Sequence, residues 1–454
     1  MRDNWREMAI ADIACNKSRR FNFDKHDQVV FINTGDVYKG EFLHSRIEYK
    51  DGLPGQAKKA IKVGDILISE IRPANGRYLF VKQSLDNHVV STKFMVVSVV
   101  SKLVDQQYLY NVLTSPNYVK EFQRIAESRS GTFPQITFDA ISYLPVLLPP
   151  LSEQKIINEI LGNIDDKIDL LRQQNATLEA MAQTLFRSWF VDFDPVIDNA
   201  LDAGHPLPDA LAARVAKRKR VRAHDHYPRL PEAVRRLFPD RFVFSEELGK
   251  WVPAGWAVKE LKSIATNKKI SVKPSDLNDN VFYIGLQDMP QKSIALESWS
   301  SAEDVASNKY RFHKGDFLFG KLRPYFHKVG IAPVDGVCST DILVIHSKRL
   351  YNFAFVLGHL SSEKLIDHVS AAATGTRMPR TNWKEIGSYQ FALPGEKVST
   401  SFNTTCSGFY GRILSNIEEV STLTKLRHTL LPPLISGKLS VENFAPAEEA
   451  VPSK

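Results

Sequence analysis

The stretch INEILGNIDDKIDLLRQQNATLEAMAQTLFRSW, residues 157–189, has the clearest periodicity in this 454-residue sequence. Its apolar and small residues recur at alternating spacings of four and three, which is the heptad pattern of a coiled coil. The ten positions of this seam are Ile157, Leu161, Ile164, Ile168, Leu171, Asn175, Leu178, Ala182, Leu185 and Trp189. The pattern predicts a long helix, spanning about 50 Å at 1.5 Å per residue, that packs against a partner helix.

A second, weaker seam lies 245 residues further along the chain. Its positions are Phe402, Cys406, Phe409, Ile413, Asn416, Val420, Leu423, Arg427, Leu430 and Leu434, and we expect Pro432-Pro433 to end the helix. If the two helices pair antiparallel over their full length, facing positions sum to 591, and Asn175 faces Asn416. A polar pair in one layer fixes the register at some cost in stability. We therefore predict an antiparallel rod with this pair near its middle. The alternative is that each Asn faces solvent or another chain.

The two seams belong to a repeat that covers most of the chain. The matches, in chain order, are Trp5 with Trp256, Gly64-Asp65 with Gly315-Asp316, Arg72-Pro73 with Arg323-Pro324, Ser91-Thr92 with Ser339-Thr340, Gly131-Thr132 with Gly375-Thr376, and Pro149 with Pro394. The shift drifts slowly from 251 through 248 to 244 and 245, and the order is kept. The chain therefore contains an internal repeat, with two copies of one unit.

Each copy alternates short β-rich runs with Gly, Asn and Asp turn signals, and in the first copy a helical stretch lies around residues 105–128. The sequence predicts an α+β fold: two similar globular domains, separated by two long antiparallel coiled-coil helices and related by a pseudo-twofold axis. The predicted segments are domain 1 (1–150), helix 1 (151–192), a basic linker (193–250), domain 2 (251–395), helix 2 (396–441) and a tail (442–454).

The composition is that of a globular protein, with 43% hydrophobic and 24% charged residues. Three distant cysteines, Cys15, Cys338 and Cys406, give neither a disulfide framework nor a thiolate zinc site. The start of the chain lacks the apolar core of a signal peptide, and no apolar run approaches the roughly 18 residues that span a bilayer. We expect a soluble, cytoplasmic protein with no membrane contact.

The net charge of +8 is concentrated in one place. Six cations and no acid lie in residues 211–222, which leaves 8 − 6 = +2 for the rest of the chain. Within this block, Lys217, Arg218, Lys219 and Arg220 are candidates for sequence-independent contacts with DNA phosphates. The alternative is a solvated linker helix. His224-Asp225-His226 lies nearby, but three residues without further ligands do not predict a metal site.

Several motifs together resemble the specificity subunit of bacterial type I restriction-modification enzymes. They are LPPLSEQ (148–154), FVDFDPV (190–196), SEELG (245–249) followed by PAGW (253–256), and SGKL (436–439) after Leu430-Leu431. The resemblance covers nearly the whole chain. It implies two target recognition domains, each reading one half of a split, asymmetric sequence in double-stranded DNA. It further implies that the helices dock two methyltransferase (modification) subunits, and that restriction/translocase subunits join the complex.

The sequence has no cofactor-binding or catalytic motif of its own. It lacks a Gly-rich cofactor loop after a strand, an Asn-Pro-Pro-Tyr-type methylation motif and a G-x-x-x-x-G-K-[ST] phosphate loop. We therefore expect a non-catalytic subunit without cofactors. The resemblance implies S-adenosylmethionine, ATP and Mg²⁺ in the partner subunits. Two alternatives are a self-contained nuclease with a D…E-x-K centre at Asp36, Glu48 and Lys50, and a protein-binding scaffold that never touches DNA.

Two repeated elements supply the candidate DNA-binding residues. The first is Gly-Asp…Arg-Pro, for which a framework role is favoured over base reading because both copies share it. Its candidates and their neighbours are Arg72, Arg77, Lys321, Arg323 and Tyr325. The second element precedes each proline exit and supplies Arg129, Thr132, Gln135, Thr376, Arg377 and Arg380. Gln135, Arg377 and Arg380 are the best candidates for base reading, because Arg pairs well with guanine and Gln with adenine.

Overall fold

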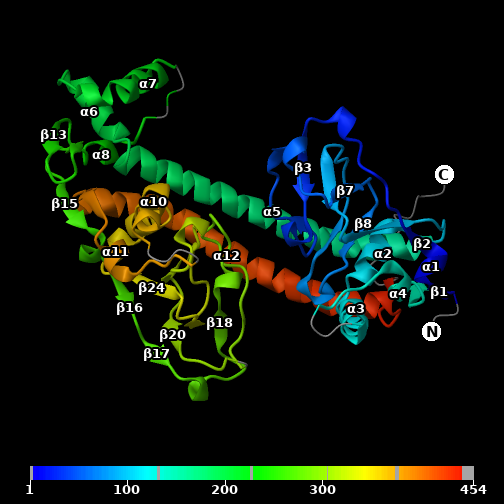
Figure 1. Cartoon of the computed structure of the whole chain (residues 1–454). Helices are drawn as coiled ribbons and strands as arrows, with labels where there is room; N and C mark the ends of the chain where they lie inside the picture. Colours follow the sequence, from blue (N-terminus) through cyan, green and yellow to red (C-terminus); the bar gives the residue numbers. More distant parts are fainter. Residues whose placement is uncertain are drawn as a thin grey trace, which may run out of the picture. The chain divides into compact units, whose positions relative to one another are not determined.

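The computed structural model describes residues 4–129, 133–224, 227, 229–303, 305–373 and 378–441. The chain forms two compact units. Unit 1 comprises the residues up to 167 and those from 424 onwards, and unit 2 comprises residues 168–423. In Figure 1, unit 1 contains the blue and cyan elements and unit 2 the green and yellow ones.

Unit 1 contains two four-stranded sheets. The first has the order β2 (Ala14–Asn16), β11 (Phe94–Val99), β8 (Ile66–Ser69), β9 (Tyr78–Phe80). The second has the order β6 (Ile47–Tyr49), β3 (Gln28–Ile32), β10 (His88–Ser91), β7 (Ala57–Ala60). β8 and nearly all of β11 are buried, as expected for continuous apolar runs. β3 and β10 run parallel, and the other pairs in both sheets are antiparallel.

Unit 2 repeats this topology. Its first sheet has the order β16 (Ala265–Lys268), β24 (Ile342–Ser347), β21 (Phe317–Gly320), β22 (Val329–Ile331). Its second sheet has the order β17 (Ser271–Val272), β20 (Lys309–Phe312), β23 (Gly336–Cys338), β18 (Phe282–Ile284), β19 (Ser300–Ser301). The strand order matches that of unit 1, including a parallel pair, β18 and β23, and β17 adds one edge strand. The predicted internal repeat is confirmed.

The helices and exit strands also recur. Unit 1 has α2 (Gln106–Leu113), α3 (Pro116–Arg129), α4 (Phe138–Ile141) and β12 (Pro145–Leu148), and unit 2 has α9 (Phe353–Leu360), α10 (Glu363–Ala372), α11 (Trp383–Gly387) and β25 (Gln390–Leu393). β12 pairs with β1 (Arg6–Ala9), and β25 pairs with β15 (Ala257–Glu260). The helical stretch predicted near 105–128 is two helices, because Thr114 caps the first and Pro116 starts the second.

The two seams lie on 40-residue helices, α5 (Leu151–Phe190) and α12 (Glu396–Ile435). In unit 2, Nδ2 of Asn416 donates to Oδ1 of Asn175 at 2.9 Å, and the rings of Trp189 and Phe402 lie 5.6 Å apart. The two residue numbers in each of these pairs sum to 591, so the predicted antiparallel register is confirmed. The prediction that Pro432-Pro433 ends the helix was wrong. The prolines lie inside the last turn, where the carbonyl of Pro432 still accepts a bond from Ser436 N.

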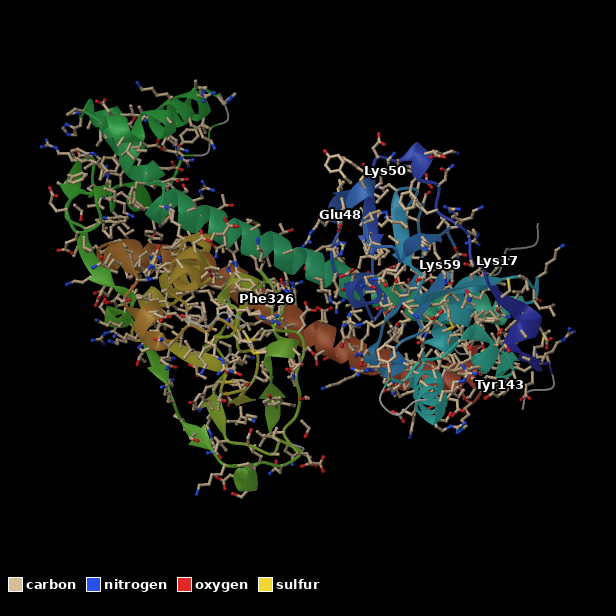
Figure 2. The ribbon with its side chains drawn as sticks, in the orientation of Figure 1. Lys17, Glu48, Lys50, Lys59, Tyr143 and Phe326 are labelled. Carbon is tan, nitrogen blue, oxygen red and sulfur yellow. The ribbon has the colours of Figure 1, made fainter. Side chains whose placement is uncertain are left out.

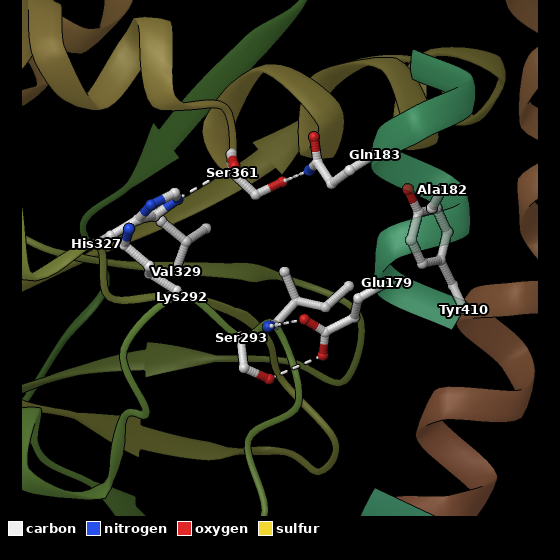
Figure 3. Close-up of a pocket in the computed structure, with 10 residues that line it drawn as sticks. Glu179, Ala182, Gln183, Lys292, Ser293, His327, Val329, Ser361 and Tyr410 are labelled. Atoms are coloured by element: carbon white, nitrogen blue, oxygen red, sulfur yellow. Dashed lines mark hydrogen bonds between the residues drawn. The ribbon is translucent and has the colours of Figure 1, made fainter. Parts of the chain in front are cut away.

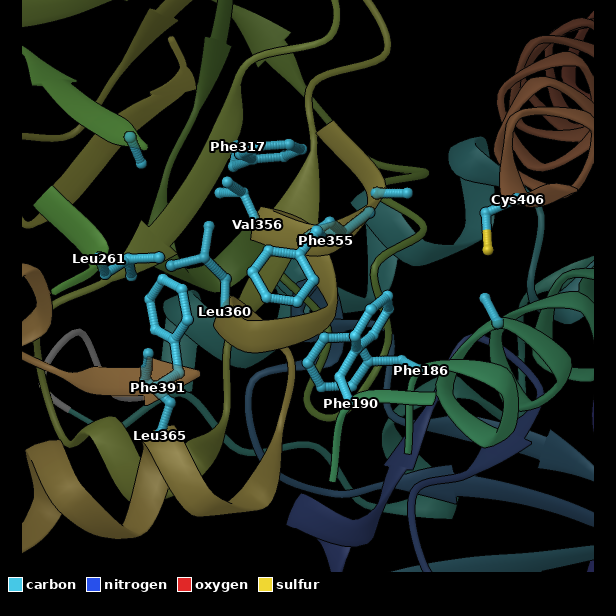
Figure 4. Close-up of a cluster of buried hydrophobic side chains, with 14 of the residues drawn as sticks. Phe186, Phe190, Leu261, Phe317, Phe355, Val356, Leu360, Leu365, Phe391 and Cys406 are labelled. Carbon is cyan, nitrogen blue, oxygen red and sulfur yellow. The ribbon is translucent and has the colours of Figure 1, made fainter. Parts of the chain in front are cut away.

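The core of unit 2 fixes the end of α5 (Figure 4). Phe190 packs edge-on against Phe355 of α9, with ring centroids 4.7 Å apart, and Phe186 lies beside both. A Cβ at Gly358 would approach the Phe186 ring to 2.3 Å, so this close helix contact requires glycine. The aromatic cluster therefore joins α5 to the globular part of unit 2.

The segment predicted as a basic linker is a folded part of unit 2. It contains α6 (Asp194–Ala203), α7 (Ala212–Arg222), α8 (Glu232–Arg235) and a hairpin of β13 (Phe242–Ser245) and β14 (Lys250–Pro253). Phe238 packs perpendicular to Trp189 at 5.0 Å, so the segment shares the core. The predicted tail, 442–454, lies outside the described residues. No helix in the described part of the chain is long and apolar enough to cross a membrane.

Candidate DNA-recognition sites

The Arg-Pro turns have the same strained geometry in both units. Arg72 and Arg323 have φ angles of 45° and 50°, in the left-handed region that non-glycine residues rarely adopt. The backbone N–H of Arg72 donates to the carbonyl of Pro134 at 3.0 Å, and that of Arg323 donates to the carbonyl of Pro379 at 2.8 Å. The two repeated elements, which are far apart in the sequence, therefore meet in each unit.

In unit 1, three chain segments meet at this point. Glu70 N donates to the Lys93 carbonyl at 2.9 Å, and Ile136 N donates to the Glu70 carbonyl at 2.8 Å. Nε2 of Gln135 donates to Oε2 of Glu70 at 3.1 Å. The side chains of Glu70, Lys93 and Gln135 are all partly exposed, and we call these three residues the unit 1 junction.

Unit 2 builds the same arrangement from Lys321, Asp341 and Arg380, the unit 2 junction. Lys321 N donates to the Asp341 carbonyl at 2.8 Å, and Thr381 N donates to the Lys321 carbonyl at 3.0 Å. Nη2 of Arg380 lies 3.5 Å from Oδ1 of Asp341. Burial lowers the pKa of Lys321; the Asp341 carboxylate opposes this shift, and neighbouring cations, including Arg380, reinforce it.

The sequence identified half of these junction residues. Gln135, Lys321 and Arg380 were predicted, whereas Glu70, Lys93 and Asp341 were missed. A signal for them was present in the repeat: Glu70 and Lys321 each stand two residues before the repeated Arg-Pro. Lys93 and Asp341 each follow the repeated Ser-Thr pair directly.

The aspartates of the Gly-Asp…Arg-Pro element have a structural role. Asp65 is 2% exposed and accepts bonds from Nη1 of Arg19 at 2.6 Å and from the Ser98 hydroxyl at 2.6 Å. Asp316 is also 2% exposed and lies 2.9 Å from Nδ1 of His346 and 3.5 Å from Nζ of Lys268. Each carboxylate ties strands of its own unit together, which agrees with the framework role favoured for this element.

The other predicted residues of this group have varied surroundings. Nη1 of Arg77 donates to the carbonyls of Gly35 and Val37 at 2.7 and 2.9 Å, so this guanidinium holds a loop of its own unit. Nη1 of Arg129 donates to the Thr137 hydroxyl at 3.1 Å. Three further candidates, Thr132, Thr376 and Arg377, lie outside the described residues.

An aromatic pair lies beside the Arg-Pro turn of unit 2. The exposed ring of Tyr325 lies 5.0 Å from that of Phe326, and the guanidinium of Arg323 lies 5.7 Å from the same phenylalanine ring. Within the described part of the chain, Nε of Arg323 is buried and has no hydrogen-bond partner. This arginine is therefore only partly engaged by its own unit.

The basic block forms one side of an ion-pair ladder between α6 and α7. Arginines at every fourth position of α7 face aspartates at every fourth position of α6, and the pairs are Arg214 with Asp194, Arg218 with Asp198 and Arg222 with Asp202. Bonds to Asp194 raise the pKa of Arg214. Figure 1 shows the two helices side by side.

This ladder changes the list of candidate phosphate contacts. Arg218 was among them, but its side chain is 13% exposed, and it bonds to Asp198 and to the Tyr227 hydroxyl. The structure thus places Arg218 in an internal network. Lys217, Lys219 and Arg220 are exposed and remain the candidate cations of this block.

A small cavity of about 50 Å³ lies where α5 meets the loop before β19 (Figure 3). Glu179 of α5 accepts bonds from the Ser293 hydroxyl at 2.8 Å and from Ile294 N at 3.1 Å. Burial raises the pKa of this carboxyl group, and the bonds oppose the shift. The residues around this cavity join the helix to the rest of unit 2.

The residues of the alternative nuclease centre have other partners. Figure 2 shows Glu48 and Lys50 on β6 and the turn that follows it. Nζ of Lys50 donates to Asp27 at 2.8 Å, and Asp36 accepts a bond from Asn33 N at 2.9 Å as the cap of its own turn. Among the residues that the structure describes, no group of three or more His, Cys, Asp and Glu side chains could hold a metal ion.

The comparisons with known proteins identify the class of protein to which these units belong. The family model described as "Type I restriction modification DNA specificity domain" matches residues 2–180. The HindI specificity subunit of Haemophilus influenzae is 37% identical, with 96% of this chain and 100% of that protein covered. The MjaIX specificity subunit of Methanocaldococcus jannaschii is 23% identical, with 74% of this chain and 69% of that protein covered. A crystal structure of a type I S subunit from M. genitalium is 12% identical, with 96% of this chain and 97% of that chain covered, at a TM-score of 0.45.

The chain belongs to the family of specificity subunits of type I restriction enzymes. Its function is recognition of the DNA target of a type I restriction-modification complex, and it is a non-catalytic subunit of that complex. Family membership therefore decides against both alternatives, the self-contained nuclease and the scaffold without DNA contact.

Proposed function

We propose that the chain recognises a split, asymmetric sequence in double-stranded DNA. Domain 1 (1–150) and domain 2 (251–395) would each read one half. One observation carries this proposal: both units repeat the same backbone junction with different side chains. Two copies of one reading module with different side chains suit two different half-sites.

We further propose that the helical segments 151–192 and 396–441 dock two methyltransferase subunits. The internal repeat supports this, because it gives each half of the chain a similar helix surface. Restriction/translocase subunits would complete the complex. S-adenosylmethionine, ATP and Mg²⁺ would be bound by these partners, since the sequence lacks their usual motifs. Stoichiometry and a cytoplasmic location remain predictions.

The exposed face of α7 supplies the proposed sequence-independent contact. Lys217, Lys219 and Arg220 carry charges that the ladder does not neutralise. Cations placed along a duplex add affinity by releasing counterions, and this affinity falls with salt. The three residues are proposed to touch phosphates rather than bases.

A mobility-shift assay with the cognate modification subunits tests the proposal. We expect specific DNA binding at moderate salt that requires both the chain and these partners. The purified chain with DNA and Mg²⁺ alone should leave the DNA intact. Absence of partner-dependent binding, or cleavage by the chain alone, would contradict the proposal.

A further inference from the structure

We propose that the two junctions determine sequence specificity, so that their side chains contact base edges of the target. The inference rests on the proposed function and deepens it by adding Glu70, Lys93 and Asp341 to the reading surface. These three residues lie beside the predicted base readers Gln135 and Arg380.

The junction backbone is the same in both units. Three hydrogen bonds recur at equivalent positions, with lengths between 2.8 and 3.0 Å. Two isolated bridges also correspond, Ile71 with Gln135 and Leu322 with Arg380. Backbone groups carry these bonds, so the identity of the side chains does not affect them. The three positions can therefore vary while the fold stays constant.

The charges at the junction are inverted between the units. The acidic residue Glu70 corresponds to the basic residue Lys321, and the basic residue Lys93 corresponds to the acidic residue Asp341. The amide of Gln135 corresponds to the guanidinium of Arg380. One framework thus presents opposite patterns of hydrogen-bond donors and acceptors.

An ion pair with a purely structural role could also have its acidic and basic residues exchanged between the two units. The contacts argue against this interpretation. Among the described residues, no ion pair within 4 Å joins Glu70 to Lys93 or Lys321 to Asp341, and the ion pair that unit 2 does form at its junction joins Asp341 to the largely exposed Arg380 at 3.5 Å. Both charges of unit 1 instead act on the amine of the buried residue Lys59, whose pKa is lowered by burial. The side chains remain partly exposed, with Arg380 at 58%. The inverted groups are therefore available to a ligand.

The chemistry of these groups suits base edges in the major groove. A carboxylate accepts from the amino group of cytosine, and a glutamine amide pairs with adenine. Arginine and lysine donate to O6 and N7 of guanine. In unit 1, Gln135 and Glu70 therefore suit an adenine or cytosine edge, and Lys93 beside them suits guanine. In unit 2, Lys321 and Arg380 suit guanine, and Asp341 suits cytosine.

Transplanting one junction into the other unit tests the inference. The full chain with Glu70→Lys, Lys93→Asp and Gln135→Arg, together with its modification subunits, is used to methylate DNA, and the methylated sequence is mapped. We expect a change at one or two base pairs of one half-site, with discrimination there altered about ten- to hundredfold. The other half-site should be unchanged.

Two outcomes would overturn the inference in a folded, assembled complex. One is an unchanged methylated sequence, and the other is an equal loss of methylation at every sequence. The reciprocal variant, Lys321→Glu, Asp341→Lys and Arg380→Gln, should alter the opposite half-site, so a folding failure of one triple still leaves a test. The control Lys82→Asp with Asp86→Lys, which exchanges one basic and one acidic residue at exposed positions between β9 and β10, should change nothing.

The result also separates this inference from the proposed function. If the proposed function fails, the unsubstituted chain gives no split methylated sequence. If only the junction inference fails, the split sequence is present and stays the same in both triple variants.

Discussion

Asn416 donates a hydrogen bond from Nδ2 to Oδ1 of Asn175 at 2.9 Å, in the layer where the two long helices of unit 2 face each other. Both residues are at most 2% exposed. Nδ2 of Asn175 and Oδ1 of Asn416 are buried, and neither has a partner in the described part of the chain. The pair is thus only half satisfied, and a buried polar group without a partner costs about 1–3 kcal/mol.

This geometry predicts opposite effects for single and double substitutions. Asn175→Leu together with Asn416→Leu should raise the free energy of unfolding by about 1–2 kcal/mol, because no polar group remains in the layer. Asn175→Leu alone should lower it by about 1–3 kcal/mol, because the buried Asn416 amide loses its bond to Asn175 and keeps only the longer one, 3.4 Å, to Gln174. Urea unfolding followed by tryptophan fluorescence measures both. A double variant less stable than either single variant would contradict the prediction.

The strained Arg72 turn predicts a loss of binding without a loss of fold. The turn uses the backbone N–H of Arg72, which glycine also has, and glycine adopts the left-handed conformation readily. Arg72→Gly should therefore keep the melting temperature or raise it slightly. Affinity for cognate DNA should fall about tenfold through loss of the exposed guanidinium. Arg124→Ala on α3 is the charge-matched control. An unchanged affinity would assign Arg72 to the framework alone.

The two faces of α7 predict two separable phenotypes. Replacing Lys217, Lys219 and Arg220 by Ala should lower the slope of log affinity against log salt by about 2–3, with the fold intact. Arg218→Met should leave the salt slope unchanged. It should destabilise the α6–α7 pair by about 3 kcal/mol, because Asp198 loses a buried partner. DNA binding at several salt concentrations and hydrogen exchange in α7 measure the two effects. A salt slope that responds to Arg218→Met instead would reverse the assignment.

The buried His359 predicts a loss of stability in acid. Burial, assisted by the charge of Lys250, lowers its pKa to about 3, and in the described structure its Nε2 has no hydrogen-bond partner. The unfolded chain, with a pKa near 6.5, binds this proton first. Stability is therefore fully present above pH 6.5 and falls as the pH drops toward 3, by about 1.4 kcal/mol at pH 5.5.

His359→Phe should flatten this part of the stability profile between pH 7.5 and 5.5. Leu360→Met, a buried substitution on the same helix, should keep the slope and serves as the control. Thermal unfolding at stepped pH gives the measurement. An equal slope in His359→Phe and the unsubstituted chain would contradict the prediction.

Local pattern was enough to predict the repeat, the helices and their register. The heptads placed Asn175 opposite Asn416 because a 4,3 spacing determines which residues share a face. The prolines near the end of α12 misled the prediction, since a proline in a last turn still leaves its carbonyl to accept a bond.

Non-local contacts explain what the sequence could not supply. The unit 1 junction joins Glu70, Lys93 and Gln135 from three separate segments, and only the folded backbone brings them together. The ion-pair ladder could not be predicted from the sequence either. Asp198 and Arg218 each belong to a series of like charges spaced four residues apart. These two series predict ion pairs only if α6 and α7 are known to be in contact.

Under the proposed function, each predicted domain reads one half of the target on its own. Exchanging residues 1–150 for the corresponding domain of another specificity subunit, and mapping methylated positions in cells that carry the modification subunits, tests it most directly. We expect a split sequence in which only one half changes and the other half is retained. A sequence in which both halves change, or in which neither does, would contradict it.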